Sequence, residues 1–265
     1  MENYYLGNGK RWLFSEAPSE NQSPWGEEIP GLIGKLLYQR NIKNKDEMDL
    51  FFHPTLEALY DPFLLEGMDA AADRIADAIR NKEKILVYGD YDADGVSATA
   101  ILVRFFRSRK VEIEYYIPDR TEEGYGISDI AAEYISGNGY DLVITVDCGI
   151  TARFQVENIY ERASEKGKPP DIIITDHHHW NGKLMPEAVA VIDPMIPGSK
   201  YPSKNLCGAG LALKLVQGVS MKLGVPHSYE DYLDLAALAT VADIVDLNGE
   251  NRIITKYGIE KIMKH

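Results

Sequence analysis

Ile85-Leu-Val-Tyr-Gly-Asp-Tyr-Asp-Ala-Asp-Gly95 joins a short apolar run to three aspartates at alternate positions. The apolar run is typical of a buried strand, and residues 96–106 continue with the pattern of a helix. Gly95 is expected to let the backbone turn between the two. A strand, an acidic loop and a helix in this order indicate an open α/β sheet, which presents its chemistry at the carboxyl ends of its strands.

Asp90, Asp92 and Asp94 are close enough in sequence for their charges to repel one another. Cations would offset this repulsion, and hard divalent metals are the obvious candidates because they prefer oxygen ligands. The alternative interpretation is an Asp-rich turn that only caps the following helix.

The 265 residues have room for one large α/β domain or two small ones, and 45% of them are hydrophobic, as in proteins with a real core. No apolar run approaches the ~18 residues of a membrane span. The N-terminus lacks the pattern of a signal peptide. Cys148 and Cys207 form no metal-binding or redox spacing, so a reduced cytoplasmic setting is the default expectation.

The net charge argues against nucleic-acid binding through a basic surface. The chain has 28 lysines and arginines against 41 acidic residues, which gives −13. A phosphate substrate stays compatible with this charge, because bound metal ions can invert the local field.

From Lys84 onward, strand and helix patterns alternate. The predicted strands are 85–88, 111–117, 142–146, 172–175 and 189–192, and the predicted helices between them are 96–108, 127–136 and 152–166. The strands are rich in valine and isoleucine, as in a parallel sheet that is covered on both faces. We therefore expect an α/β fold with an open, mostly parallel sheet and helices on both faces. Further helices are predicted at 29–39, 45–52, 68–81, 208–223, 229–241 and 255–264.

Acidic and histidine side chains also follow other predicted strands. Asp147 ends one strand, and Asp176, His177, His178 and His179 end the next. Because neighbouring parallel strands end at one edge of the sheet, these side chains and the acidic loop are expected to meet there. Asp243 lies in an otherwise apolar stretch, where an unpaired carboxylate is costly to bury.

These residue types suit a dinuclear metal centre. Carboxylates can bridge two ions, and imidazole favours manganese over magnesium or calcium. Two ions about 3.5–4 Å apart can hold the attacking and leaving oxygens of a phosphoryl transfer. In the competing interpretations, Asp147 caps a turn and the three histidines form a solvated loop, with His179 the weakest candidate.

Four motifs resemble those of the DHH phosphoesterase superfamily: Gly89-Asp-Tyr-Asp-Ala-Asp-Gly95, Val146-Asp-Cys-Gly149, Asp176-His-His178 and Thr240-Val-Ala-Asp243. Within it, flanking stretches resemble the RecJ family of single-stranded-DNA-specific exonucleases: 52–68, 119–127, 206–210 and 249–252. Together they cover nearly everything from residue 50 to 255, in family order.

The resemblance implies a metal-dependent phosphodiesterase that acts in DNA repair and recombination. It would use two Mn²⁺ (or Mg²⁺) ions and a metal-bound hydroxide to degrade single-stranded DNA from its 5′ end to 5′-mononucleotides. The implied metal ligands are Asp90 or Asp92, Asp94, Asp147, His177 and Asp243. Asp147 would bridge the ions and, with His177 and His178, form the catalytic group, with His178 near the scissile phosphate as ligand or transition-state partner.

The resemblance also implies substrate contacts. Arg120 and Arg252 would contact phosphate or the DNA strand. Gly208 and Gly210 would offer backbone N–H groups to a phosphate, unless they simply begin a helix. Tyr125 would either stack on the substrate or pack within the protein.

Two departures from the family pattern shape these expectations. Some relatives have a histidine where Tyr88 stands, so the sequence leaves open which carboxylate serves the first ion, with Asp90 as the candidate to take over. RecJ proteins also continue beyond the position of Lys264. We accordingly expect an N-terminal extension (1–65) that packs on the core, a catalytic domain (66–254) and the start of a helix (255–265) that connects to a second, DHHA1-like domain. Other repair proteins would bind the full-length chain, and no membrane would be involved. These residues alone would be weakly active or inactive.

Two alternatives remain at this point. One is a DHH-type phosphodiesterase for short oligonucleotides or cyclic dinucleotides. The other is a non-catalytic scaffold, although such relatives usually lose metal ligands and this chain keeps its acids and histidines.

Overall fold

The computed structural model describes residues 4–7, 10–13, 29, 31–180, 182 and 184–264. It separates the chain into two compact units, residues 1–55 and 56–265. None of the helices in these described ranges combines the length and apolar character needed to cross a membrane. The extension over 1–65, and its packing on the core, stay predictions.

The first unit contains a strand pair and two short helices. The strands β1 (Tyr4–Gly7) and β2 (Lys10–Leu13) run antiparallel. The helices α1 (Gly31–Gln39) and α2 (Lys45–Phe52) match the predicted ranges to within two residues. Leu37, Ile42 and Met48 form their small shared core.

The second unit is built on a parallel sheet of five strands, in the order β4-β3-β5-β6-β7. The strands are β3 (Ile85–Gly89), β4 (Ile113–Tyr116), β5 (Leu142–Val146), β6 (Asp171–Thr175) and β7 (Ala190–Ile192). All five predicted strands are present, and the expectation of an open parallel sheet is confirmed.

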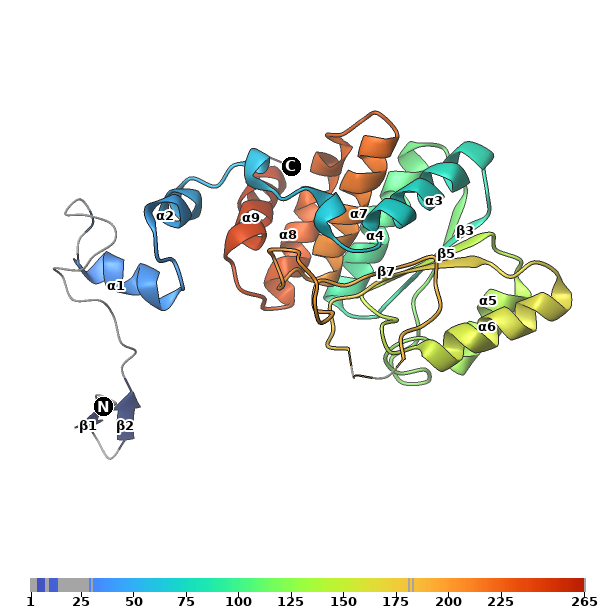
Figure 1. The fold of residues 1–265 in the computed structure, drawn as a ribbon, viewed down its shortest axis with the longest axis horizontal. Coiled ribbons are helices and arrows are strands. Elements are labelled where there is room, and N and C mark those ends of the chain that lie inside the picture. Colours follow the sequence, from blue (N-terminus) through green and yellow to red (C-terminus); the bar gives the residue numbers. More distant parts are fainter. Residues whose placement is uncertain are drawn as a thin grey trace. The chain divides into compact units, whose positions relative to one another are not determined.

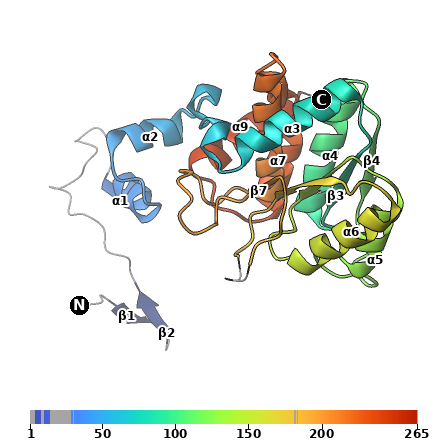
Figure 2. The ribbon, with the colours of Figure 1, turned by 45° about the vertical axis from the view of Figure 1, so that its right-hand side comes forward.

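Helices cover both faces of the sheet (Figure 1). One face packs against α3 (Met68–Asn81), α4 (Ala93–Ser108), α7 (Gly208–Lys222) and α8 (Leu233–Ala242). The other packs against α5 (Asp129–Gly137) and α6 (Arg153–Lys166), and the turned view separates the same two groups (Figure 2). The last helix, α9 (Gly249–Ile262), packs on α8.

The side chains of β3 show why the sheet needs two helical layers. Ile85 and Val87 belong to the core under α4 and α7, whereas Leu86 and Tyr88 belong to the core under α5 and α6. This alternation is the two-residue period of a strand, and here both faces are apolar. The sequence therefore reads as a continuous apolar run.

Chain connectivity reverses at β3. From β3 the chain passes through α4 to the edge strand β4, and then returns through α5 to β5 on the other side of β3. In open α/β sheets, ligands bind in the crevice at the carboxyl ends of the strands where such a reversal occurs. The residues that follow β3 and β5 are thus the first place to look for a site.

The region around Gly95 differs from the expectation. The helix begins at Ala93 and not at residue 96, so Gly95 lies inside its first turn and does not turn the chain. A Cβ at this position would lie 2.5 Å from the carbonyl oxygen of Asp90. Glycine is needed here because α4 approaches the Asp90 backbone closely.

Two helical boundaries also differ. The predicted helix 229–241 is divided into a 3₁₀ segment (Ser228–Tyr232) followed by α8. The final predicted helix begins six residues earlier than expected, at Gly249.

A buried ion pair joins α7 to α9 in the second unit. Lys214 Nζ lies 3.0 Å from Glu250 Oε1, and both side chains are almost fully buried. Glu250 also accepts hydrogen bonds from the Tyr201 hydroxyl (2.6 Å) and from the Tyr60 N–H (3.0 Å). Lys214 donates as well to the Tyr60 carbonyl. The carboxylate thus connects two helices and two loops.

Glu250→Ala should therefore destabilise the fold strongly, because it leaves the Lys214 ammonium buried without its counter-ion. We expect a loss of about 3–5 kcal/mol in the free energy of unfolding, measured by urea denaturation. The control is Asp69→Ala, which removes a solvent-exposed partner of Lys222 and should leave the free energy of unfolding almost unchanged. Equal losses in the two variants would contradict a structural role for the buried pair.

Candidate metal centre

Acidic and imidazole side chains from separate elements converge at the carboxyl edge of the sheet. They form three overlapping groups, in each of which the potential ligand atoms lie within 4.8 Å of one another. The groups are Asp90, Asp92 and Asp147; Asp147, His177 and His178; and Asp94, His177 and Asp243. All six residues predicted as metal ligands, together with His178, are thus brought to one place. The role of each residue stays a prediction.

Asp147 lies at the centre of this arrangement. It follows β5, is 1% exposed, and has a positive φ of 61°. Only a few non-glycine residues adopt this conformation, with aspartate among the more tolerant. Burial is the largest cause that raises the pKa of Asp147 to about 7, with Asp94 and Asp92 contributing and His177 opposing. Asp147 therefore carries a costly negative charge that a cation would stabilise.

Asp92 has the helix-capping role that the alternative interpretation proposed. Its Oδ1 accepts the N–H groups of Asp94 and Gly95, both at 2.9 Å. A carboxylate has two oxygens, so this cap leaves Oδ2 for another ligand. Capping and metal binding are therefore compatible at this residue.

Asp94 is held by the beginning of α7. Its two oxygens accept the N–H groups of Gly208 (2.6 Å) and Ala209 (2.7 Å), where the helix dipole favours an anion. Burial nevertheless raises the pKa of Asp94. The N–H of Gly210 points to Cys207 Sγ at 3.4 Å. The N–H groups of Gly208 and Gly210 thus both have acceptors within the protein, and their contact with a phosphate stays a prediction.

His177 connects the acidic groups. Its Nε2 lies 3.0 Å from Asp147 Oδ1 and 3.5 Å from Asp94 Oδ2, and its Nδ1 lies 4.0 Å from Asp243 Oδ2. Burial alone would lower the pKa of His177, but the three carboxylates outweigh it and raise the pKa to about 9. Asp243 caps the carboxyl end of α8, which brings its side chain into the same cluster.

Asp176 orients His178. Its Oδ1 lies 2.8 Å from His178 Nδ1 and accepts the N–H groups of His177 (2.8 Å) and His178 (3.1 Å), while its Oδ2 accepts the Ile150 N–H (2.9 Å). Burial alone would raise the pKa of Asp176, but these contacts outweigh it and lower the pKa. The same contact with Asp176 raises the pKa of His178.

Two buried oxygens test whether these residues suit a metal ion. Within the described part of the chain, Asp90 Oδ1 and Asp147 Oδ1 are buried without a hydrogen-bond partner, although His177 Nε2 lies 3.0 Å from Asp147 Oδ1. Burial also raises the pKa of Asp90. Unpartnered buried carboxylate oxygens beside an imidazole are the donor set that manganese and magnesium accept, so the residues present fit the predicted pair of ions.

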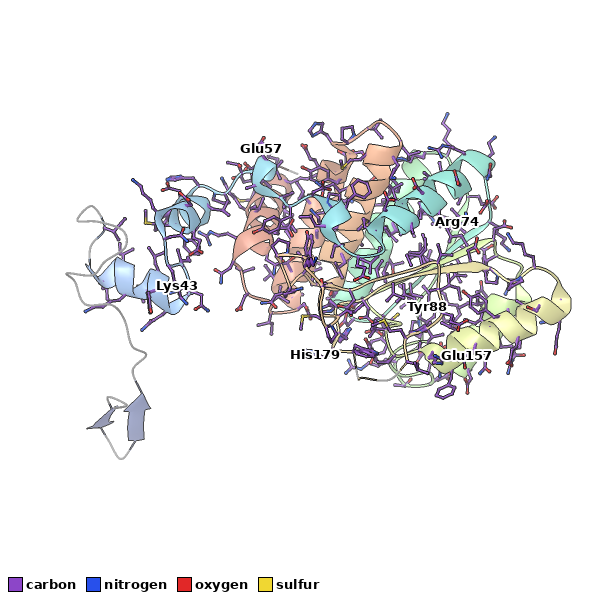
Figure 3. The ribbon with its side chains drawn as sticks, viewed as in Figure 1. Lys43, Glu57, Arg74, Tyr88, Glu157 and His179 are labelled. Carbon is purple, nitrogen blue, oxygen red and sulfur yellow. The ribbon has the colours of Figure 1, made fainter. Side chains whose placement is uncertain are left out.

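Three further residues named in the sequence analysis are Arg120, Arg252 and His179. The Arg120 guanidinium lies 5.4 Å from the centre of the Tyr91 ring, beside the acidic loop. Arg252 is on α9, and burial lowers its pKa. His179 is exposed, and Figure 3 shows it at the opposite end of the sheet from Arg74. Direct contacts of these arginines with a substrate stay predictions.

Tyr88 does not leave an empty ligand position. Its ring lies in the core under α5 and α6, as Figure 3 shows, and its hydroxyl donates to the Gly126 carbonyl at 2.7 Å. Asp90 and Asp92 both belong to the first ligand group. The geometry is therefore compatible with either aspartate as a ligand of the first ion, as the sequence was.

Asp176 and Asp193 are two buried aspartates to which the sequence assigns no role. Asp193 directly follows β7, is 5% exposed, and has its pKa raised to about 7, mainly by burial. The rule that acids at strand ends gather at one edge would have identified Asp193. A carboxylate is a common partner that orients an imidazole, so Asp176, directly before two histidines, was a candidate for that role.

Comparison with known proteins agrees with this geometry. The model of the DHH family, N-terminal domain, matches residues 84–240, which is more than half of the chain. The chain belongs to the DHH family. Its relatives include the single-stranded-DNA-specific exonuclease RecJ of Bacillus subtilis (38% identical; 98% of this chain, 32% of the relative) and of Thermus thermophilus (36% identical; 95% of this chain, 35% of the relative). The chain thus spans about a third of the length of these relatives.

Solved structures of the same family share the fold. A crystal structure of exonuclease RecJ bound to manganese has a TM-score of 0.68 at 36% identity, over 78% of this chain and 50% of that one. RecJ from Thermus thermophilus in complex with Mn²⁺ has a TM-score of 0.74 at 31% identity, over 93% of this chain and 34% of that one.

Gly208→Ala should damage the centre, because the new Cβ would lie 2.5 Å from Asp147 Cβ. We expect Mn²⁺ affinity, measured by calorimetry, to fall at least about tenfold as Asp147 is displaced. Gly210→Ala is the matched control in the same helical turn, where the nearest atoms are 3.4 Å away on the Leu206 side chain. Similar affinities in both variants would show that the close approach of α7 to Asp147 is unimportant.

Asp147→Ala should abolish Mn²⁺ binding while the fold stays intact. Binding should be lost because Asp147 is shared by two ligand groups. The fold should persist because the variant also removes a buried charge that is costly without a cation. We expect no binding heat in calorimetry and an unchanged far-UV circular dichroism spectrum. The exposed Asp246 provides the control variant, Asp246→Ala. Retained Mn²⁺ binding by Asp147→Ala would exclude its central position.

Proposed function

We propose that this chain is the metal-dependent catalytic part of an exonuclease specific for single-stranded DNA. The observation that supports the proposal most is the pair of ligand groups that share Asp147, within a DHH-family sheet. The relatives that carry the name single-stranded-DNA-specific exonuclease, and the RecJ structures bound to manganese, supply the substrate class and the metal. Degradation from the 5′ end to 5′-mononucleotides is part of the proposal and rests on the family resemblance.

The acidic character of the chain is consistent with this role. A net charge of −13 opposes the approach of a phosphate backbone, and the carboxylates at the centre oppose it most. Two bound divalent ions would offset this charge, hold the scissile phosphate and lower the pKa of a water molecule. Bound ions would therefore make the approach of the substrate more favourable.

The protein's own residues would hold the ions and contact the scissile phosphate. Asp90, Asp92, Asp94, His177 and Asp243 would hold the ions, with Asp147 between them. Asp94 is fixed for this by the N–H groups of α7, and Asp92 by its cap on α4. His178 would contact the scissile phosphate, because Asp176 fixes its ring and leaves Nε2 free. An imidazole held in this way would stabilise the additional negative charge that develops on the phosphate.

Arg120 is placed to contact the strand that leads to the centre. It lies over Tyr91, whose backbone separates Asp90 from Asp92. A guanidinium on an aromatic ring offers a charge for phosphate and a flat surface for a base. We extend the proposal to Arg252 on family grounds, and to a cytoplasmic role in DNA repair with other repair proteins as partners.

The assay that tests this function uses enzyme in excess over a single-stranded oligonucleotide labelled at either end, with Mn²⁺. Label at the 5′ end should be released at once as a mononucleotide, whereas label at the 3′ end should shorten progressively. Duplex DNA should be degraded at least about tenfold more slowly, and Asp147→Ala should show no turnover.

Three outcomes would contradict the proposal. Faster cleavage of a dinucleotide than of the long strand would indicate an enzyme for short substrates. Release from the 3′ end would reverse the proposed direction. Tight Mn²⁺ binding with no cleavage of any substrate, even at enzyme excess, would leave a metal-binding protein that is not a nuclease.

A further inference from the structure

The loop between β4 and α5, residues 117–128, forms one border of the metal centre and is called the rim loop below. Its Tyr125 hydroxyl lies 2.8 Å from His178 Nδ1 and 3.5 Å from the carbonyl oxygen of Asp147. The two rings meet edge to face, with centroids 5.1 Å apart at 62°. Tyr125 therefore contacts one predicted catalytic residue through its side chain and lies near the backbone of another.

The polar groups around His178 Nδ1 determine where its protons lie. Asp176 is fully buried, and its Oδ1 already accepts the backbone N–H groups of His177 and His178, so it faces His178 Nδ1 as an acceptor. Nδ1 must then carry a proton and donate it to Asp176. The Tyr125 oxygen is a second acceptor beside this proton, and its own hydroxyl is directed to the Asp147 carbonyl. Nε2 is the ring nitrogen that these contacts leave for a substrate or an ion.

The rim loop needs support to hold Tyr125 in this position. Gly124 and Gly126, on either side of Tyr125, have positive φ values of 75° and 86°, and nothing lies within 4 Å of their Cβ positions. Glycines in this conformation allow wide backbone motion. The position of Tyr125 therefore depends on contacts made by the rest of the loop.

Two sets of hydrogen bonds supply this support. Glu123 accepts bonds from the Tyr116 hydroxyl (2.9 Å), the Asp119 N–H (3.0 Å) and the Ser128 hydroxyl (2.5 Å). Tyr88, fully buried at the end of β3, donates to the carbonyl of Gly126 and stacks on Tyr116 with centroids 5.5 Å apart. The core of the sheet is thus connected to the backbone next to Tyr125.

We propose that Tyr125 is a positioning residue for the catalytic step: supported by the Tyr88–Gly126 hydrogen bond, its hydroxyl fixes the His178 ring with Nε2 available to the scissile phosphate. This inference rests on the proposed function for its effect on turnover, but not for its effect on the ring. It assigns a function to Tyr88 as well, since this residue acts on the centre through the rim loop.

The test compares Tyr125→Phe with Tyr115→Phe, because both variants remove one hydroxyl and keep the ring. Tyr115 is an exposed residue of β4, outside the rim loop. In Tyr125→Phe, kcat for single-stranded DNA with Mn²⁺ should fall about tenfold while KM stays within about twofold, because a mobile imidazole is misplaced in the reacting complex. Tyr88→Phe should lower kcat in the same way, but less.

A second measurement follows the ring directly, without turnover. In metal-free protein labelled with ¹⁵N-histidine, the two-bond ¹H–¹⁵N correlation spectrum should show the His178 proton on Nδ1. Tyr125→Phe should broaden these ring signals through motion, and Tyr115→Phe should leave them sharp.

The outcomes separate the inference from the proposed function. If the unmodified chain does not cleave DNA but Tyr125→Phe still mobilises the His178 ring, the proposed function fails and the positioning role is kept. Unchanged ring signals in Tyr125→Phe would overturn the positioning role. So would an increase in KM at constant kcat, which would make Tyr125 a DNA contact.

Discussion

The burial of several carboxylates within a few ångströms of one another is the constraint on which this structure depends. Asp90, Asp94 and Asp147 are nearly inaccessible to solvent, and burial raises the pKa of each. A fold that only needed stability would avoid such a cluster, because each buried charge costs free energy unless it is paired. Divalent cations bound at the centre would pair these charges and offset that cost.

The scaffold offsets this repulsion with backbone groups. The beginning of α7 donates two N–H groups to Asp94, the beginning of α4 donates two to Asp92, and three N–H groups surround Asp176. These donors are fixed by helices and by the turns after β5 and β6, so they orient each carboxylate before an ion binds. Gly95 and Gly208 belong to the same design, because each allows a helix to approach an aspartate more closely than a Cβ would permit.

The sequence predicted the sheet and the members of the centre well. The apolar runs marked all five strands, and the simple rule that parallel strands end at one edge brought Asp90, Asp147 and His177 together. The sequence did not predict features that depend on the distance between two backbone segments. Gly95 was expected to turn the chain, whereas it lies where α4 closely approaches the Asp90 backbone. The orientation of His178 by Tyr125 also depends on a loop conformation that no local pattern specifies.

The most direct test of the central claim is a crystal of the protein soaked in Mn²⁺, with the ions located from their anomalous scattering. We expect two peaks about 3.5–4 Å apart, with Asp147 between them and with His177 and the aspartates of the acidic loop as neighbours. A single peak, or peaks that Asp147 does not contact, would contradict the claim that these side chains enclose a pair of ions.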